Sequence, residues 1–343
     1  MSGRRIGLGG KPLSEGSPLF GGPREEEPAM GKAVAVSAGA EEGLHEREAF
    51  DPRADDYAAP PEIVPAAANL ADLRALLPAT EDERSLDDWG RSERFLSLVE
   101  PALNFYYRYW FRVVAEGVDN IPFQGGALLV SNHSGALPPD APMIMQAIRN
   151  EHPSPRPLYM LGEHWFKGYP GVGMLANKLG LVAAHRDNAQ RLLYDEGRLA
   201  IVFPEGQKGS RKLYWQRYRL RRFGRGGFVR TAIRARVPIV PIALVGGEEA
   251  MPIFAHMRFL QRLSGLIYFP LNHAFPHFGL AAGLLYMPAK FKIRFMEPVD
   301  MAQYPPETAD DAGAIQEIAE GIRTQIQLQL DDMLSARRSV WFG

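Results

Sequence analysis

Residues 127–140 read ALLVSNHSGALPPD, an apolar run followed by polar residues and two prolines. Similar short apolar runs recur along the chain, and we expect each of them to form a strand. They span residues 127–130, 158–161, 181–184, 199–203, 239–245 and 291–295. Helical periodicity lies between several of these runs, near residues 141–149, 188–198 and 226–236. This alternation predicts an α/β fold in which helices cover both faces of the sheet.

The composition bounds the class of protein. With 46% hydrophobic and 23% charged residues, the 343-residue chain has globular composition, which excludes a wholly disordered protein. It contains no cysteine, so disulfides, thiolate metal sites and a cysteine nucleophile are excluded. No run of about 20 apolar residues is free of charge and proline, so a simple membrane span is not expected. Because the net charge is −1, any basic binding surface must be local.

Four regions are predicted along the chain. Residues 1–65 hold 10 Gly, 8 Pro and a net charge of −5, and we expect a disordered acidic tail. Residues 66–115 are predicted to be N-terminal helices, and residues 116–310 to be the α/β domain. Residues 311–343 are predicted to contain a closing helix. Its apolar stripe consists of Ile315, Ile318, Ile322, Ile326, Leu330 and Met333.

Two apolar segments have a structural and a membrane interpretation. Residues 105–111 carry six aromatic side chains in seven positions, which favours either contact with a membrane interface or packing in the core. Residues 265–286 are also rich in apolar residues but contain His273, His277 and prolines. Interfacial insertion, core packing and a membrane span are the alternatives for this segment, with the span the least favoured.

Several classes of site are not indicated. There is no G-x-S-x-G elbow and no phosphate-binding G-x-x-x-x-G-K-[ST] loop. A loose match to a dinucleotide fingerprint at residues 171–176 does not follow a clear strand. We therefore expect neither a cofactor nor a metal, and no nucleic-acid partner.

A histidine follows the first strand directly. His133 lies near the carboxyl end of residues 127–130, where α/β sheets usually place their chemistry. Its side chain is suited to act as a general base, and Asp140 could accept a hydrogen bond from the other ring nitrogen. Asp140 could instead be the N-cap of the next helix, which begins near residue 141.

Three further blocks follow strands in the same way. Arg186 follows the run 181–184 by two positions and could bind a phosphate with its guanidinium group. The sequence FPEG at residues 203–206 offers the Glu205 carboxylate and, at Gly206, close approach to the backbone. The sequence VPIVP at residues 237–241 is typical of a strand entrance.

The most basic part of the chain lies after FPEG. From Lys208 to Arg236 there are 11 basic residues and no acidic residue, with Tyr214, Trp215, Tyr218 and Phe223 among them. Such a segment favours phosphates or anionic lipid headgroups. A solvated surface without a ligand and RNA binding are the alternatives.

These blocks, in this order, resemble the phospholipid/glycerol acyltransferase family, the group that includes lysophosphatidic acid acyltransferases. The resemblance covers about residues 116–300. It implies a mixed sheet flanked by helices, with an N-terminal helical element on the membrane. It also implies acyl transfer from acyl-CoA or acyl carrier protein to a glycerolipid hydroxyl, with His133 as base and Asp140 orienting it. Arg186, Glu205, Gly206, Lys208 and Arg211 are then expected to bind the acceptor.

The chain departs from the family pattern at two places. Six residues, Ser134 to Pro139, separate His133 from Asp140, where the family usually has four. After FPEG the chain has Gln207-Lys208-Gly209 in place of the common Thr-Arg-Ser. A neutral mono- or diacylglycerol acceptor and a degenerate, lipid-binding protein therefore stay as alternatives. We expect a peripheral or monotopic protein on the cytoplasmic face of a membrane with anionic lipids, and the oligomeric state is open.

Overall fold

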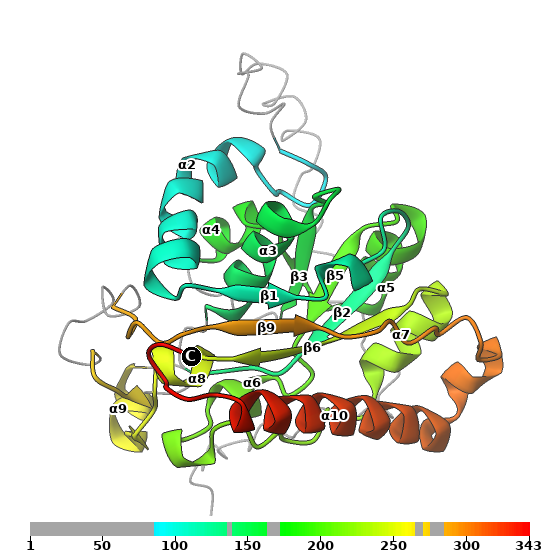
Figure 1. The fold of residues 1–343 in the computed structure, drawn as a ribbon. Coiled ribbons are helices and arrows are strands. Elements are labelled where there is room, and N and C mark those ends of the chain that lie inside the picture. The colour runs from blue at the N-terminus through cyan, green and yellow to red at the C-terminus, as the bar shows by residue number, and fades with distance from the viewer. Residues whose placement is uncertain (1–85, 136–138, 163–171, 265–269, 275–284) are drawn as a thin grey trace, which may run out of the picture. The chain divides into compact units, whose positions relative to one another are not determined.

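The structure is a computed structural model that describes residues 86–135, 139–162, 172–264, 270–274 and 285–343 (Figure 1). All of them belong to one of the two units of the chain, Leu73–Gly343. The predicted acidic tail, the first of the predicted helices and most of the apolar segment 265–286 lie outside the described residues.

A seven-stranded mixed sheet forms the centre of the described part. The strands are β1 (Val114–Glu116), β2 (Ala127–Ser131), β3 (Leu158–Gly162), β4 (Leu181–Ala183), β5 (Leu199–Val202), β6 (Ile239–Val245) and β9 (Lys292–Phe295). Their order in the sheet is β1-β9-β6-β2-β5-β3-β4. The β6 and β9 strands pair antiparallel and all other neighbours pair parallel. The predicted fold class is confirmed, and each of the six predicted strands is present.

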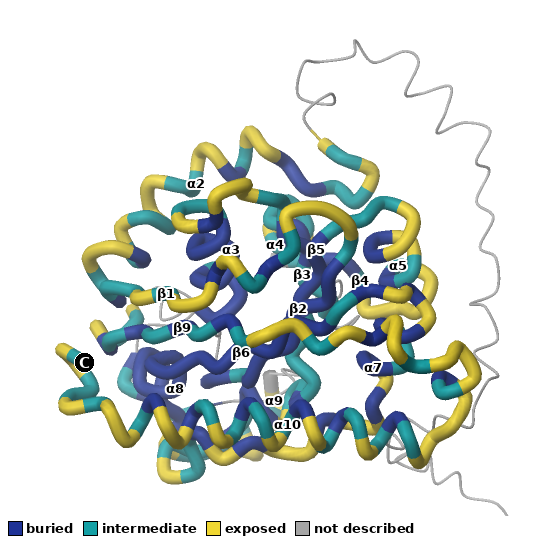
Figure 2. Tube along the Cα trace, turned by 45° about the vertical axis from the view of Figure 1, so that its right-hand side comes forward, coloured by how far each residue is buried: buried dark blue, intermediate teal, exposed yellow. Residues whose placement is uncertain are grey.

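Helices cover both faces of the sheet (Figure 1). One face packs against α7 (Gly227–Ala235) and the long α10 (Ala312–Ser335), and the other against α2 (Glu93–Phe105) and α3 (Asp140–Glu151). Every residue of β2 and β6 is buried, as expected for strands covered on both sides (Figure 2). Smaller elements complete the chain. They are α4 (Val172–Lys178), α5 (Arg186–Gln190), α6 (Gln207–Ser210), α8 (Gly247–Ala250), α9 (Arg258–Ser264) and the antiparallel pair β7 (Ala255–His256) and β8 (Pro270–Leu271).

The closing helix follows its predicted stripe. Asp311 caps α10 by accepting hydrogen bonds from the N–H groups of Gly313 and Ala314, at 2.8 and 3.1 Å. The apolar stripe faces the sheet, with Ile315, Ile322, Ile326, Leu330 and Met333 buried. Burial of this stripe fixes α10 across the lower face in Figure 1.

The aromatic segment after α2 divides between two environments. Helix α2 continues into a π-helical turn, Tyr106–Trp110. Tyr107 and Phe111 are buried in the core, and the Phe111 ring stacks on Phe291 with centroids 4.3 Å apart. Phe105 and Tyr109 point outward, and the Tyr109 side chain is 72% exposed. Core packing therefore accounts for part of this segment only.

Within the described ranges, no helix combines the length and the apolar character that crossing a bilayer requires.

Candidate active site

Three strand ends meet where the predicted catalytic residues lie. Because β2 runs parallel to both β5 and β6, the carboxyl ends of the three strands share one edge of the sheet. His133 follows β2, the segment 203–206 follows β5, and α8 follows β6. The FPEG segment is thereby brought beside His133, as their order after neighbouring strands suggests.

Asn132 fixes the chain just before the histidine. Its side chain is fully buried and makes a two-way contact with the backbone of β6. The amide nitrogen Nδ2 donates to the carbonyl of Leu244 at 3.0 Å, and Oδ1 accepts from the Leu244 N–H at 2.8 Å. The side chain thus continues the pairing of β2 with β6 beyond the last strand residue, a role that the sequence pattern did not indicate.

His133 and Asp140 are in contact despite the long spacing. His133 Nδ1 lies 3.1 Å from Asp140 Oδ2, and the Asp140 side chain is fully buried. Ser134 closes the loop, because its N–H donates to Oδ2 at 2.8 Å and its hydroxyl donates to Oδ1. Asp140 is the first residue of α3, where the helix dipole favours a carboxylate. The N-cap of α3 is Pro139, so the N-cap interpretation of Asp140 is wrong.

The other nitrogen of His133 points away from this contact. The imidazole lies flat on the Phe203 ring, with centroids 4.4 Å apart and an interplanar angle of 22°. Its side chain is 19% exposed, and no described residue bonds to Nε2. A ring held through Nδ1 with Nε2 open to a ligand has the geometry of a general base.

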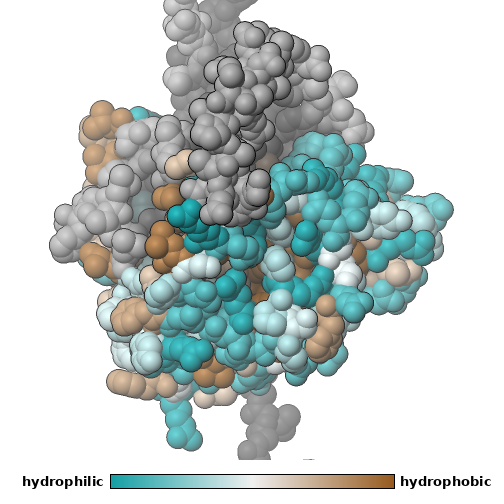
Figure 3. Space-filling view, turned by 90° about the horizontal axis from the view of Figure 1, so that it is seen from above, coloured by the Kyte–Doolittle hydropathy of each residue, from teal (hydrophilic) through white to brown (hydrophobic). Residues whose placement is uncertain are grey.

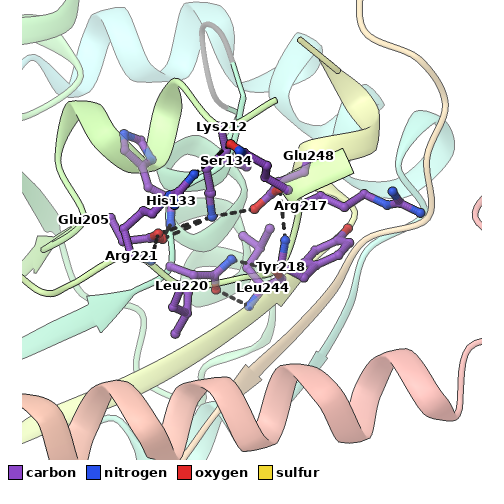
Figure 4. A network of polar contacts seen from close by, with 12 residues as sticks. His133, Ser134, Glu205, Lys212, Arg217, Tyr218, Leu220, Arg221, Leu244 and Glu248 are labelled. Carbon is purple, nitrogen blue, oxygen red and sulfur yellow. Dashed lines mark hydrogen bonds and ion pairs between the residues drawn. The ribbon is translucent and has the colours of Figure 1, made fainter. Parts of the chain in front are cut away.

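Glu205 holds the backbone of the histidine. Its buried carboxylate accepts the N–H of His133 at 3.0 Å and the N–H of Arg221 at 2.8 Å (Figure 4). Lys212 Nζ lies 3.3 Å from the same carboxylate and 2.7 Å from Glu248 Oε1. Glu205 therefore ties the loops after β2 and β5 to a lysine and to α8. The predicted contact of Glu205 with the acceptor stays a prediction.

The buried ion pairs change the protonation of their members. Burial raises the pKa of Glu248 to about 7, and the attraction of Lys212 opposes that shift. Burial alone lowers the pKa of Lys212, but Glu248 and Glu205 outweigh it and raise this pKa above its ordinary value. The Lys212 ammonium group is therefore charged at neutral pH.

A second buried group joins α8 to the end of α10. Tyr218 donates its N–H to Glu248 at 3.1 Å and its hydroxyl to Glu249, while Arg337 Nη1 donates to Glu249 at 2.9 Å. The Tyr218 hydroxyl also accepts the Gly246 N–H at 2.8 Å. Burial raises the pKa of Tyr218 well above its ordinary value, so the phenol stays neutral. These contacts fix α8 against Tyr218 and against Arg337, which follows α10.

Glycines allow the loops to approach each other. Gly206 has φ of 53° and ψ of −147°, a conformation that favours glycine. Gly209 is packed against His133 and Glu205, because a Cβ there would lie 2.9 and 2.7 Å from their Cβ atoms. Gly247 lies against Asp140, whose Oδ1 would be 2.6 Å from a Cβ at that position. Only the first of these three was expected from the sequence.

The basic segment is less uniform than its sequence suggests. Lys208 is exposed on α6 and Arg211 follows it, half-buried. Lys212, by contrast, is only 3% exposed, and Arg234 pairs with Asp310 at 2.7 Å. Lys212 therefore does not contribute to a basic surface, because it pairs with the Glu205 and Glu248 carboxylates in the interior.

Arg186 is separated from the other predicted acceptor-binding residues. It begins α5 after β4, and β5 and β3 lie between β4 and β2 in the sheet. Strand spacing alone places it about 14 Å from the end of β2. Its predicted contact with the acceptor therefore requires a ligand that extends along the edge of the sheet.

Comparison with known proteins gives the family. The model of the acyltransferase family matches residues 112–245, which include His133, Asp140 and FPEG. An uncharacterized protein of Mycobacterium tuberculosis is 43% identical over 260 residues, which cover 76% of this chain and 72% of that protein. The chain belongs to the acyltransferase family. This confirms the family that its motifs resemble.

Other relatives are more distant. An uncharacterized protein of Mycobacterium leprae is 41% identical over 76% of this chain and 70% of its own length. A Gallus gallus protein described as a DGAT1/2-independent enzyme synthesizing storage lipids is 26% identical over 56% of this acyltransferase and 53% of its own length. The crystal structure of the 1-acyl-sn-glycerophosphate acyltransferase PlsC from Thermotoga maritima superposes with a TM-score of 0.47 at 19% identity. It covers 80% of this chain and 90% of that one.

No group of three or more metal-binding side chains lies in the described ranges.

Proposed function

We propose that the protein transfers a fatty acyl group from acyl-CoA or acyl carrier protein to a hydroxyl group of a glycerolipid, with His133 as general base. The observation that carries this proposal is the His133–Asp140 contact of 3.1 Å, which leaves Nε2 open in a member of the acyltransferase family. The Asp140 carboxylate holds the proton on Nδ1, so that Nε2 is the basic nitrogen.

The reaction follows from that tautomer. His133 Nε2 removes the proton of the acceptor hydroxyl as its oxygen attacks the thioester carbonyl carbon. The tetrahedral oxyanion collapses, the carbon–sulfur bond breaks, and the thiolate takes the proton from the imidazolium. The ester and the free thiol are the products. Asp140 stabilises the imidazolium while it exists, and a positioned base contributes about 10²–10⁴-fold to the rate.

Two classes of acceptor have support. Lys208 and Arg211 lie just after FPEG and are suited to bind the phosphate of lysophosphatidic acid, with Gly206 near the glycerol end. Glu205 would act there by holding the His133 and Arg221 backbone, because its carboxylate is buried. A neutral mono- or diacylglycerol is supported by the description of the chicken relative as an enzyme synthesizing storage lipids. It is also supported by the pairing of Lys212 and Arg217 with carboxylates, which leaves them less free for a phosphate.

The degenerate lipid-binding alternative has lost its main support. It drew on the six residues between His133 and Asp140, a longer spacing than the family usually has. The His133–Asp140 contact, with Ser134 bound to the same carboxylate, supports the enzyme over this alternative.

We further propose that the enzyme works at a membrane surface, on the cytoplasmic face, as a peripheral or monotopic protein. Its substrates are lipids, and the outward Phe105 and Tyr109 on the N-terminal helical element are suited to an interface.

The test is release of free thiol by the purified protein, with acyl-CoA and acyl carrier protein as donors. The acceptor panel contains lysophosphatidic acid, other lysophospholipids, monoacylglycerol and diacylglycerol. We expect thiol release only with a hydroxyl acceptor, with the acylated product found by mass spectrometry. Thiol release that does not depend on any acceptor indicates hydrolysis and contradicts the proposal.

A further inference from the structure

Helix α9 carries two large apolar side chains that the fold leaves in solvent. Phe259 and Leu263 are 77% and 76% exposed, and their i,i+4 spacing puts them on one side of the helix. Phe254, just before β7, is 43% exposed. Exposed apolar groups of this size mark a surface that binds something.

Cations flank these apolar residues. Arg258 and Arg262 are both exposed, each precedes an apolar residue of the pair, and no described carboxylate is paired with either. The chain has no Asp or Glu anywhere from Ala250 to Met296. We call Phe254, Arg258, Phe259, Arg262 and Leu263 the α9 surface. This surface combines exposed apolar side chains with two positive charges and contains no acidic residue.

These properties select one occupant. Apolar side chains beside arginines match an anionic bilayer, where the rings and the leucine enter the acyl region and the guanidinium groups stay among the headgroups. A second copy of the chain is a poor match, because a symmetric contact would set the arginines of one α9 against those of the other without carboxylates between them.

The α9 surface is connected to the catalytic loops. The Phe254 ring packs on Tyr214 with centroids 6.0 Å apart, and the Tyr214 N–H donates to the carbonyl of Ile253 at 2.8 Å. His256 Nε2 lies 2.8 Å from the carbonyl oxygen of Arg211. On the other side, Gly135 packs against the backbone of Met251. The segment that leads into α9 therefore contacts both the loop after His133 and the basic segment.

We propose that α9 docks the enzyme on an anionic bilayer, so that the lipid acceptor reaches His133 directly from the membrane. Figure 1 places α9 at the lower left, below the sheet. Figure 3 views the molecule from above, where hydrophilic residues cover most of the described surface. The proposal rests on the proposed function for the identity of the acceptor, but the docking itself is measured without catalysis.

The absence of cysteine makes a direct test possible. Leu263→Cys, labelled with a polarity-sensitive fluorophore, is mixed with phosphatidylcholine vesicles that contain or lack phosphatidylglycerol. Leu328→Cys is the matched control, because Leu328 is a leucine 65% exposed on α10. We expect a blue shift and quenching by lipid-embedded quenchers at position 263 only, larger with phosphatidylglycerol. Equal signals at both positions overturn the proposal, and so does a shift that follows protein concentration without vesicles, which indicates self-association.

Two unlabelled variants separate the apolar and the charged contributions. Phe259→Ser with Leu263→Ser is expected to lower vesicle partitioning at least about tenfold. Arg258→Gln with Arg262→Gln is expected to abolish the preference for phosphatidylglycerol. Vesicle binding by this variant should then no longer weaken as the salt concentration rises. Both variants are expected to keep thiol release with a dispersed, short-chain acceptor. Wild-type partitioning in the serine variant overturns the docking role, whereas absence of thiol release in the wild type contradicts the proposed function and leaves the docking result standing.

Discussion

Nδ1 of His133 lies 3.1 Å from Oδ2 of Asp140 although six residues, among them two consecutive prolines, separate the two in the chain. The contact is made because Ser134 binds both carboxylate oxygens of Asp140, with its N–H on one and its hydroxyl on the other. A longer spacing than the family usually has is thus compatible with the same pairing.

Removal of the base is the first prediction. His133→Ala is expected to lower the rate of thiol release by about 10²–10⁴-fold, because it removes the nitrogen proposed to accept the hydroxyl proton. The far-ultraviolet circular dichroism spectrum and the melting temperature are expected to change little, since the ring is at the edge of the core. A folded variant with full activity contradicts the assignment of the base.

Asp140→Asn tests the orienting role. The amide keeps the shape of the carboxylate but can donate to Nδ1, which favours the tautomer with its proton on Nε2. We expect a fall in kcat of up to about 10⁴-fold with the KM for the acceptor nearly unchanged. A rise in the KM for the acceptor, without loss of kcat, points instead to a role in substrate binding.

The strands of the sheet could be predicted because their signals are local. Ile239–Val245 forms β6 with the bounds expected from its continuous apolar run. The edge strand β1 was missed, because two of its three residues are exposed and the strand is held in place by pairing with β9, far along the chain. Short edge strands carry little pattern of their own.

The sequence predicted only those site residues that have a reactive side chain and directly follow a predicted strand. His133 and Glu205 both follow strands, and the structure brings them together. Glu248 was missed, although it lies in the same network, because its partner Lys212 is 36 residues earlier and nothing local marks a buried pair. For the same reason Lys212 seemed to belong to a surface charge cluster.

Gly247 allows α8 to pack closely against Ser134 and Asp140. In Gly247→Ala the added Cβ would overlap the Ser134 hydroxyl and lie 2.6 Å from Asp140 Oδ1. Displacement of Asp140 by about 1 Å is expected to lower kcat by about 10². Gly321→Ala on α10 is the matched control, since no atom lies within 4 Å of its added Cβ. It is expected to keep full activity and to gain stability, because alanine favours a helix. Equal activity in the two variants contradicts this role of Gly247.

Lys212 is predicted to stabilise the fold through its two carboxylate partners. Lys212→Met leaves Glu205 and Glu248 buried without a counter-ion, which is expected to lower the free energy of unfolding by about 3–5 kcal/mol. Combining it with Glu248→Met removes one unpaired charge and is expected to restore part of that loss. Denaturant unfolding of the single and double variants measures the coupling. Strictly additive effects mean that the two side chains do not interact.

The pKa of Glu248 gives the protein a specific dependence of stability on pH. Because the folded pKa of about 7 lies above the ordinary value of 4.5, the folded state holds a proton that the unfolded state releases. This contribution is fully present below pH 4.5 and is lost as the pH rises through 7. Glu248→Gln mimics the protonated side chain at every pH. Between these two pH values the wild type loses stability and the variant does not, so the free energy of unfolding of the variant rises relative to that of the wild type. Above pH 7 the difference between the two proteins is expected to stay constant. Denaturant unfolding at a series of pH values measures this difference, and parallel curves for the two proteins contradict the raised pKa.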